Sequence, residues 1–313
     1  MKIWDDISNF EANNPVITIG SFDGVHLGHQ QVLKQLNAAA KKVNGESVVF
    51  TFSPHPVKVL APNKEFVLLN TLEEKIELFR KAEIDHLVLF PFTLEFSQLT
   101  YAEFVKTILV EKLHMNTLLV GYDNTIGNNK EGDYKQVLKL SKELKYSVLK
   151  QDEIRLDENK LSSTYIRELL SQGKLLDASK LLGYAYMVSG TVVHGQQIGN
   201  KLGFPTANVL PADNKFIPGM GVYAVLVEYK TGIYKGMMNI GVRPTLEDFA
   251  KKPIIEAHLF DFHGDLYGEF IKIEIIRKLR NEYKFDSVEA LRAQLKKDKL
   301  FALETLEKEF GIE

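Results

Sequence analysis

Short apolar runs alternate with stretches of helical periodicity over the first half of the chain. The runs are rich in Val, Ile, Leu and Phe, which is typical of buried parallel strands. We predict strands at Val16–Ile19, Ser47–Phe52, Leu87–Phe90, Leu118–Val120 and Ser147–Leu149. Apolar residues at helical spacing predict helices at Gln30–Val43, Leu72–Ala82, Tyr101–Leu113 and Lys135–Lys145. This alternation indicates a parallel sheet with right-handed crossovers, in which ligands bind at the carboxyl ends of the strands.

The pattern changes in the second half. Two short helices separated by Gly173 are predicted over residues 163–182, and helical character ends at Gly183. Beyond them, runs rich in Val, Ile, Tyr and Phe predict strands at Met187–Val193, Val222–Glu228, Ile233–Ile240, Ile254–Phe260 and Phe270–Ile276. Little helix intervenes, which favours an antiparallel barrel followed, from Asp286 on, by a helix packed against it. We place the boundary at 183, giving domains 1–183 and 184–313.

The composition is that of an ordinary folded protein. The 313 residues are 45% hydrophobic and 26% charged, enough for two domains. A net charge of −2 gives no bulk attraction to nucleic acid or to a membrane, so we expect neither partner. Cysteine is absent, which excludes disulfides, thiolate metal sites and a cysteine nucleophile. No signal peptide or long apolar span is found, so we expect a cytoplasmic protein, whose oligomeric state stays open.

The first chemistry-bearing segment follows the strand at Val16–Ile19. Gly20 and Gly24 permit a tight turn or a close approach to a ligand. The helix that follows would point its free N–H groups at this turn, which favours an anion. His26 and His29 lie three residues apart and share one helix face. Two imidazoles beside an anion site suggest chemistry on a phosphate, although a glycine turn with a surface histidine is a common structural feature.

Three further polar segments follow predicted elements. Pro54 and Pro56 hold His55 in a rigid loop, which is equally typical of an exposed histidine with no role. Asp123 lies in a long glycine-bearing loop that could close over a ligand or be a simple connection. Ser162, Ser163, Thr164 and Arg167 stand at a helix start, where they could cap the helix or grip a polyphosphate.

A glycine-rich segment opens the second half. Gly195, Gly199 and Gly203 recur every four residues, without the Gly-Lys-Ser/Thr ending of a Walker A loop. By themselves they fit a plain hairpin. Thr206 and Asn208 add two oxygen ligands of the kind that a hard cation prefers.

The first half resembles a known family. Residues 20–29 are similar to the HxGH motif of the nucleotidyltransferases, in the form found in bacterial FMN adenylyltransferases. The family's PHP, GxDxxFG and SSTxIR motifs also have counterparts here, in the same order. The resemblance implies that His26 and His29 stabilise the α-phosphate of ATP. It further implies ATP contacts by Gly20, Phe22, Asp23, Gly24, Ser162, Ser163, Thr164 and Arg167, and a flavin or nucleotide pocket at His55, Asp123 and Asn124.

This half departs from the family pattern at three positions. Asn124 and Ile126 stand where aromatic residues are common, and Tyr165 stands where arginine is frequent. The roles of these three residues stay open.

The second half resembles the riboflavin kinases. The glycine segment with Gly-Phe-Pro-Thr-Ala-Asn matches their signature, and counterparts of PxxGVY, NIGxRPT and the segment with the general base follow in order. The resemblance implies that Thr206 and Asn208 bind magnesium and ATP phosphates. By the same resemblance, Glu256 is the general base, Arg280 and Phe285 lie near the flavin, and the residues covering the nucleotide are Gly195, Gly199, Lys201 and Gly203.

Together the motifs cover nearly the whole chain, which is identified as a member of the bifunctional riboflavin kinase/FMN adenylyltransferase family. The resemblance implies a Rossmann-like nucleotidyltransferase domain and a six-stranded antiparallel barrel with a terminal helix. ATP, riboflavin and FMN are then the substrates and Mg²⁺ the cofactor. The alternatives are a nucleotidyltransferase for another phosphate acceptor, or a flavin-binding regulatory protein without turnover.

Overall fold

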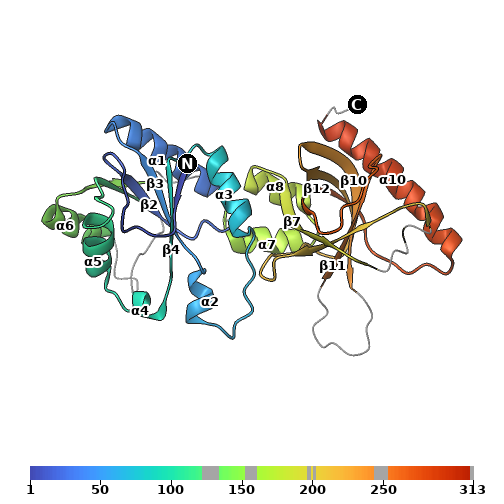
Figure 1. The fold of residues 1–313 in the computed structure, drawn as a ribbon, viewed down its shortest axis with the longest axis horizontal. Helices are drawn as coiled ribbons and strands as arrows, with labels where there is room; N and C mark the ends of the chain where they lie inside the picture. The colour runs from blue at the N-terminus through green and yellow to red at the C-terminus, as the bar shows by residue number, and fades with distance from the viewer. Residues whose placement is uncertain (122–133, 152–160, 196–198, 200–201, 243–252, 311–313) are drawn as a thin grey trace. The chain divides into compact units, whose positions relative to one another are not determined.

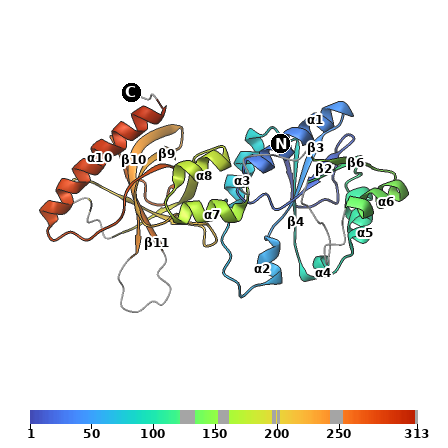
Figure 2. The same cartoon turned by 180° about the vertical axis from the view of Figure 1, so that it is seen from behind.

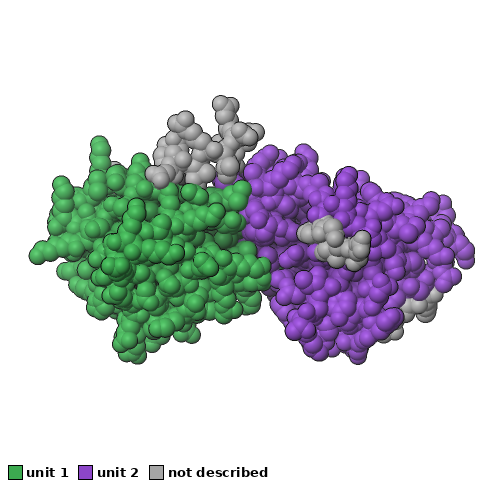
Figure 3. Space-filling view, turned by 90° about the horizontal axis from the view of Figure 1, so that it is seen from above, with its two compact units in different colours: residues 1–66, 72–159 green, residues 67–71, 160–313 purple. Residues whose placement is uncertain are grey.

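The computed structural model describes residues 1–121, 134–151, 161–195, 199, 202–242 and 253–310. The chain forms two compact units, shown as ribbons in Figure 1 and in different colours in Figure 3. The first unit comprises residues 1–66 and 72–159, and the second comprises residues 67–71 and 160–313. The boundary that we predict at residue 183 falls between two elements of the second unit. Within the described ranges, no helix is both long and apolar enough to cross a membrane.

The first unit is built on a parallel sheet of six strands. The strands are β1 (Lys2–Trp4), β2 (Val16–Ile19), β3 (Ser47–Phe52), β4 (His86–Phe90), β5 (Thr117–Val120) and β6 (Ser147–Lys150), in the order β1-β4-β3-β2-β5-β6. Every strand pair is parallel, as the alternating pattern predicts. The central strands β2 and β3 are almost wholly buried, which explains their continuous apolar runs.

Helices connect the strands of this sheet. They are α1 (Leu27–Lys42), α2 (Pro56–Leu60), α3 (Leu72–Lys81), α4 (Leu94–Ser97), α5 (Tyr101–Phe104) and α6 (Tyr134–Leu144). The single helix predicted at Tyr101–Leu113 is wrong in detail, because α5 continues as a π-helix over Val105–Val110. Phe104 and Leu109 pack on Ile17 and Phe50 in one buried cluster, so this helical segment covers one face of the sheet.

The second unit is a closed antiparallel barrel. Its strands are β7 (Tyr186–Val193), β8 (Ala207–Pro211), β9 (Gly221–Tyr229), β10 (Gly232–Val242), β11 (Pro253–Leu259) and β12 (Phe270–Arg280), in the order β10-β11-β8-β7-β12-β9, with β9 pairing back to β10. The six-stranded barrel is confirmed, although periodicity predicts only five of the strands. The missing one, β8, begins within the motif Pro205–Asn208.

In the described part of this unit, three helices pack on the barrel. They are α7 (Ser163–Ser171), α8 (Leu175–Leu182) and the terminal α10 (Val288–Phe310), which lies along β9, β10 and β12 (Figures 1 and 2). Ile166 and Leu182 join the buried cluster of the barrel interior, whereas Ala302 and Leu306 of α10 pack in a separate cluster with Met237. The residues that α10 covers alternate along the strands with those of the interior cluster, so the terminal helix packs on the outer wall of the barrel, whereas α7 and α8 pack on its interior cluster.

Candidate functional site

The turn between β2 and α1 holds the paired histidines. His26 caps α1, because its Nδ1 accepts a hydrogen bond of 3.4 Å from the backbone N–H of His29. The two rings stack with centroids 3.8 Å apart and planes inclined by 14°. Since Nδ1 of the neutral His26 ring is an acceptor, its hydrogen lies on Nε2. The pair therefore offers a ring N–H donor at the carboxyl end of a central strand.

Both histidines are held neutral. Burial lowers the pKa of His26 from 6.5 to about 4. Burial, with smaller contributions from His26 and Lys75, keeps the pKa of His29 well below 6.5. The His29 Nδ1 atom is buried and has no hydrogen-bond partner among the described residues. Neutral rings of this kind can donate hydrogen bonds to an incoming phosphate.

The turn has an unusual backbone. Phe22, Gly24 and Val25 have φ values of 49°, 86° and 34°. A positive φ is easy for glycine but rare for a β-branched residue, so Val25 is a strained position. A side chain at Gly20 would press on the Phe22 ring, which packs edge-on against His29 and Phe79 at 5.2 and 5.5 Å. Gly20 and Phe22 therefore shape the wall on which His29 rests.

Lys75 of α3 also contacts this turn, although no sequence motif points to it. The buried Lys75 Nζ donates a 2.8 Å hydrogen bond to the carbonyl oxygen of Ser21. Burial lowers its pKa, and nearby Asp23, itself buried, opposes that effect. One signal was available, because Lys75 lies three and four residues before Leu78 and Phe79, on the buried face of α3.

The other predicted residues of the first site belong to other elements of the fold. His55 caps α2 and stacks on Phe66 with ring centroids 4.6 Å apart. Asp123 and Asn124 lie outside the described residues. Ser162 caps α7, and Arg167 donates to the carbonyl of Val67 at 3.1 Å.

Ser162 and Arg167 belong to the second unit, together with Ser163 and Thr164 in the first turn of α7, whereas the histidine turn belongs to the first. The fold thus divides the predicted residues of this site between the two units.

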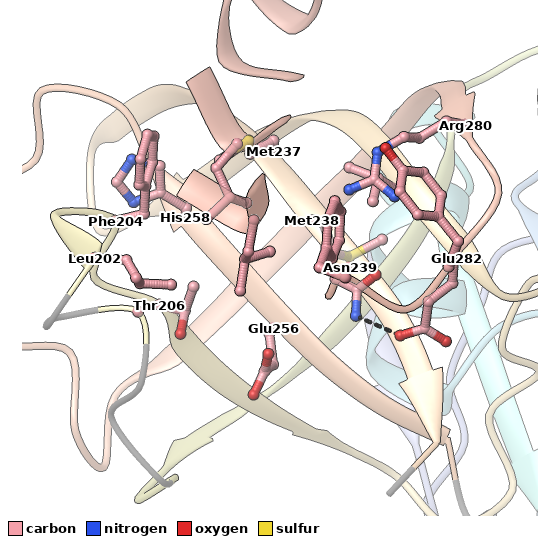
Figure 4. Close-up of a pocket in the computed structure, with 16 residues that line it drawn as sticks. Leu202, Phe204, Thr206, Met237, Met238, Asn239, Glu256, His258, Arg280 and Glu282 are labelled. Carbon is pink, nitrogen blue, oxygen red and sulfur yellow. Dashed lines mark hydrogen bonds between the residues drawn. The ribbon is translucent and has the colours of Figure 1, made fainter. Parts of the chain in front are cut away.

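The barrel contains a pocket of about 320 Å³, drawn in Figure 4. It is lined by several predicted residues, namely Gly199, Thr206, Glu256, Arg280 and Phe285. Thr206 and Glu256 both point into the pocket (Figure 4). Lys201 lies outside the described residues. Gly203 has a φ of +81°, and a Cβ atom added there would have no neighbouring atom within 4 Å. The barrel therefore brings together residues that are up to 86 positions apart in sequence, Gly199 and Phe285.

Asn208 lies beside Glu256 although it does not line this pocket. The two residues are direct partners across β8 and β11, and Asn239 of β10 is the next in the same row. Direct cross-strand partners have Cβ atoms about 4.5–5.5 Å apart and point to the same face. The Asn208 Oδ1 atom is buried and has no hydrogen-bond partner among the described residues. A buried amide oxygen without a partner, next to a carboxylate, suits an added cation.

The glycine segment lies against these oxygen ligands. A Cβ atom on Gly195 would overlap the Asn208 amide, and one on Gly199 would overlap the carbonyl oxygen of Phe204 and lie 3.2 Å from Thr206 Oγ1. Side chains at these two positions would therefore displace Asn208 and Thr206. No three His, Cys, Asp or Glu side chains cluster as a metal site in the described part of the chain.

Arg280 is fixed at the other end of the pocket by a residue that we did not predict. Its guanidinium binds the buried carboxylate of Asp298 through hydrogen bonds of 3.0, 3.1 and 2.8 Å. Gln294 donates to the same carboxylate at 2.8 Å, and the guanidinium lies 4.7 Å from the Tyr283 ring centroid. Arg280 is thus oriented by α10, with an aromatic ring on one side.

Comparisons with known proteins cover both units. A family model described as FAD synthetase matches residues 9–165, and one described as riboflavin kinase matches residues 182–306. Bifunctional riboflavin kinase/FMN adenylyltransferases are 38% identical in Listeria monocytogenes (94% of this chain, 91% of the relative) and 35% identical in Buchnera aphidicola (95% and 96%). A solved structure titled macrolide-efflux protein, from Streptococcus pneumoniae, is 30% identical, with a TM-score of 0.85, covering 96% of this chain and 97% of that one.

The fold and the two sets of residues define a two-domain transferase, with a nucleotidyltransferase-type sheet and a riboflavin kinase-type barrel. The chain belongs to the bifunctional riboflavin kinase/FMN adenylyltransferase family.

Proposed function

We propose that the barrel transfers the γ-phosphate of ATP to riboflavin, and that the histidine turn serves the transfer of AMP from a second ATP to the FMN formed. The products are FMN and ADP at the first site, and FAD and pyrophosphate at the second. The observation that supports this most directly is the presence in one chain of a buried histidine pair at a strand end and of Glu256 beside Asn208 in a barrel.

In the kinase reaction, Glu256 accepts the proton of the ribityl 5′-hydroxyl as that oxygen bonds to the γ-phosphorus and ADP leaves. Arg280 and Phe285 contact the flavin at the far side of the pocket from Thr206. The glycines at 195, 199 and 203, with Lys201, cover the nucleotide. Alignment and charge stabilisation account for most of the rate in such phosphoryl transfers.

Magnesium fits the donor set of the barrel. Thr206 and Asn208 supply a hydroxyl and an amide oxygen, and the Asn208 oxygen otherwise has no partner in the described structure. When bound, the ion neutralises phosphate charge. The fit rests on this buried, unsatisfied oxygen and on glycines that leave room for phosphates.

In the adenylyl transfer, a phosphate oxygen of FMN bonds to the α-phosphorus of ATP and the bond to pyrophosphate breaks. His26 and His29 donate hydrogen bonds to the charge that develops on the α-phosphate. Gly20, Phe22, Asp23 and Gly24 shape the turn around the nucleotide. Ser162, Ser163, Thr164 and Arg167 grip the remaining phosphates, and the His55 loop borders the flavin or the nucleotide.

A product assay tests the proposal. Riboflavin and Mg-ATP given to the purified protein should yield FMN and then FAD, separated by chromatography. His29→Ala should stop at FMN, with FAD formation lowered by about 10²–10³-fold. Glu256→Gln should lower riboflavin phosphorylation by about 10²–10⁴-fold and leave adenylylation of added FMN intact. Equal loss of both reactions in either variant, or no flavin product from the wild type, would contradict the assignment.

A further inference from the structure

We propose that His258 is a positioning residue of the kinase pocket, which holds the segment Phe204–Thr206 in place through the carbonyl oxygen of Pro205. The inference rests on the proposed kinase function of the barrel. His258 lies on β11 two residues beyond Glu256, so both side chains are on the same face of the strand. It is buried and lines the same pocket (Figure 4).

The hydrogen bond fixes which ring nitrogen carries the hydrogen. His258 Nδ1 lies 2.7 Å from the carbonyl oxygen of Pro205. A carbonyl oxygen only accepts, so Nδ1 must be the donor, in the neutral ring as well as in the protonated one. Burial lowers the pKa of His258, which favours the neutral ring with hydrogen on Nδ1 alone.

Two aromatic rings hold the imidazole in this orientation. Phe204 and Phe260 contact it edge-on, with centroids 5.3 and 5.6 Å away and planes inclined by 71° and 65°. A ring rotated by 180° about its Cβ–Cγ bond would turn Nδ1 away from the carbonyl. The packing therefore fixes the plane of the ring, and the hydrogen bond to Pro205 selects which of its two orientations is adopted.

The bond acts on the peptide that joins Pro205 to Thr206. Proline fixes its own φ, and the peptide group is planar. The direction of the Pro205 carbonyl therefore sets the orientation of the Pro205–Thr206 peptide plane. The other end of the segment is tied by the Phe204 N–H, which donates to the Gly199 carbonyl at 2.9 Å. β8 holds the chain from Ala207 on, so without the His258 bond the Pro205–Thr206 peptide is the part that can rotate, and the Thr206 hydroxyl can then turn away from the phosphate side of the pocket.

The test compares two isosteric substitutions. In His258→Asn, the amide nitrogen occupies the place of Nδ1 and can still donate to Pro205. In His258→Gln, the amide nitrogen reaches the place of Nε2, and the donor to Pro205 is lost. We expect the Gln variant to raise the KM for Mg-ATP and the Mg²⁺ concentration at half-saturation about tenfold in riboflavin phosphorylation, the loss expected for one hydrogen bond. The Asn variant should stay within about threefold of the wild type, because one amide donor replaces another.

Controls separate positioning from general damage. Adenylylation of added FMN should be unchanged in both variants, and thermal unfolding shows that each is folded. If Gln behaves as the wild type, or if Asn is as impaired as Gln, the proposal is wrong. A wild type that forms no FMN would instead refute the proposed function. A nitrogen NMR spectrum of the unsubstituted protein needs no variant, since a neutral His258 with hydrogen on Nε2 would overturn the inference.

Discussion

The histidine pair shows how burial prepares a residue for its chemistry. His26 and His29 sit in a turn whose Phe22, Asp23 and Val25 are all buried, and burial disfavours the charged imidazolium. Neutral rings donate hydrogen bonds without a positive charge that would have to be stabilised before the nucleotide arrives. An incoming phosphate would supply the opposite charge, and its approach would favour protonation of the same rings.

We expect the pKa of His26 to be near 4 in the free protein and to rise when a non-hydrolysable ATP analogue binds. A pH titration followed by nitrogen NMR of labelled histidine measures both values, with His26→Asn used to assign the signal. In the unfolded state His26 binds a proton with its ordinary pKa of 6.5, whereas in the folded state it does so only with a pKa of about 4. The first unit should therefore lose stability as the pH falls from 6.5 to 4. A free-protein value near 6.5 would contradict the burial argument.

Sequence could identify residues that act through a motif, but not those that support it. His26, Thr206 and Glu256 stand in recognisable strings, whereas Lys75 and Asp298 sit within ordinary helical patterns. Their importance comes from hydrogen bonds to residues 54 and 18 positions away. Such partners are set by tertiary packing, which periodicity does not encode.

Among the elements, β8 links the glycine segment to the rest of the barrel. It carries Asn208 in register with Val193 of β7 and with Glu256 of β11, so one short strand aligns a ligand oxygen with the carboxylate. Gly195 lies two residues after the end of β7 and approaches the Asn208 amide closely. The position of the Asn208 amide therefore depends on the absence of a side chain at Gly195.

Gly195→Ala should impair the kinase selectively. The new Cβ would overlap the amide of Asn208, and because that side chain is short and buried, relief requires moving its Oδ1 as well. We expect riboflavin phosphorylation to fall at least about tenfold, equivalent to 1.4 kcal/mol. Adenylylation of added FMN should not change. Leu210→Ala on the exposed side of β8 is the control and should leave both rates near wild type. A Gly195→Ala kinase of full activity would show that the close approach is dispensable.

The elements that sequence missed share a physical cause. Strands β2 and β3 were predicted to the residue, because a buried parallel strand is a continuous apolar run. The strand β1 at Lys2–Trp4 is short and exposed at the edge of the sheet, so it has no such run. The π-helix over Val105–Val110 keeps an apolar face that helical periodicity cannot distinguish from an α-helix. Both elements are therefore determined by contacts between distant segments and by local hydrogen bonding, which the apolar pattern of the sequence does not reveal.

At the scale of the whole molecule, the two units are not consecutive pieces of sequence. Residues 67–71 belong to the barrel unit although residues on both sides belong to the sheet unit. The Leu68 N–H donates to the backbone carbonyl oxygen of Asn214 at 2.7 Å, and the buried Lys215 Nζ donates to the carbonyl oxygen of Leu69 at 2.5 Å. Leu69 itself is fully buried in the cluster of the barrel interior, with Ile166 and Leu182. The barrel unit thus includes residues 67–71, which would be lost from it if the chain were divided at a single boundary.

Leu69→Ala should therefore destabilise the barrel unit, although residue 69 is flanked in sequence by residues of the sheet unit. Truncating a fully buried leucine costs about 2–5 kcal/mol, and a unit of this size then melts roughly 4–20 °C lower. The measurement is the riboflavin phosphorylation that remains after heating, alongside calorimetry of the full chain. Leu33→Ala on α1, equally buried but in the sheet unit, is the matched control and should leave the heat resistance of the kinase unchanged. If Leu69→Ala spares the kinase and Leu33→Ala impairs it, the segment 67–71 does not stabilise the barrel.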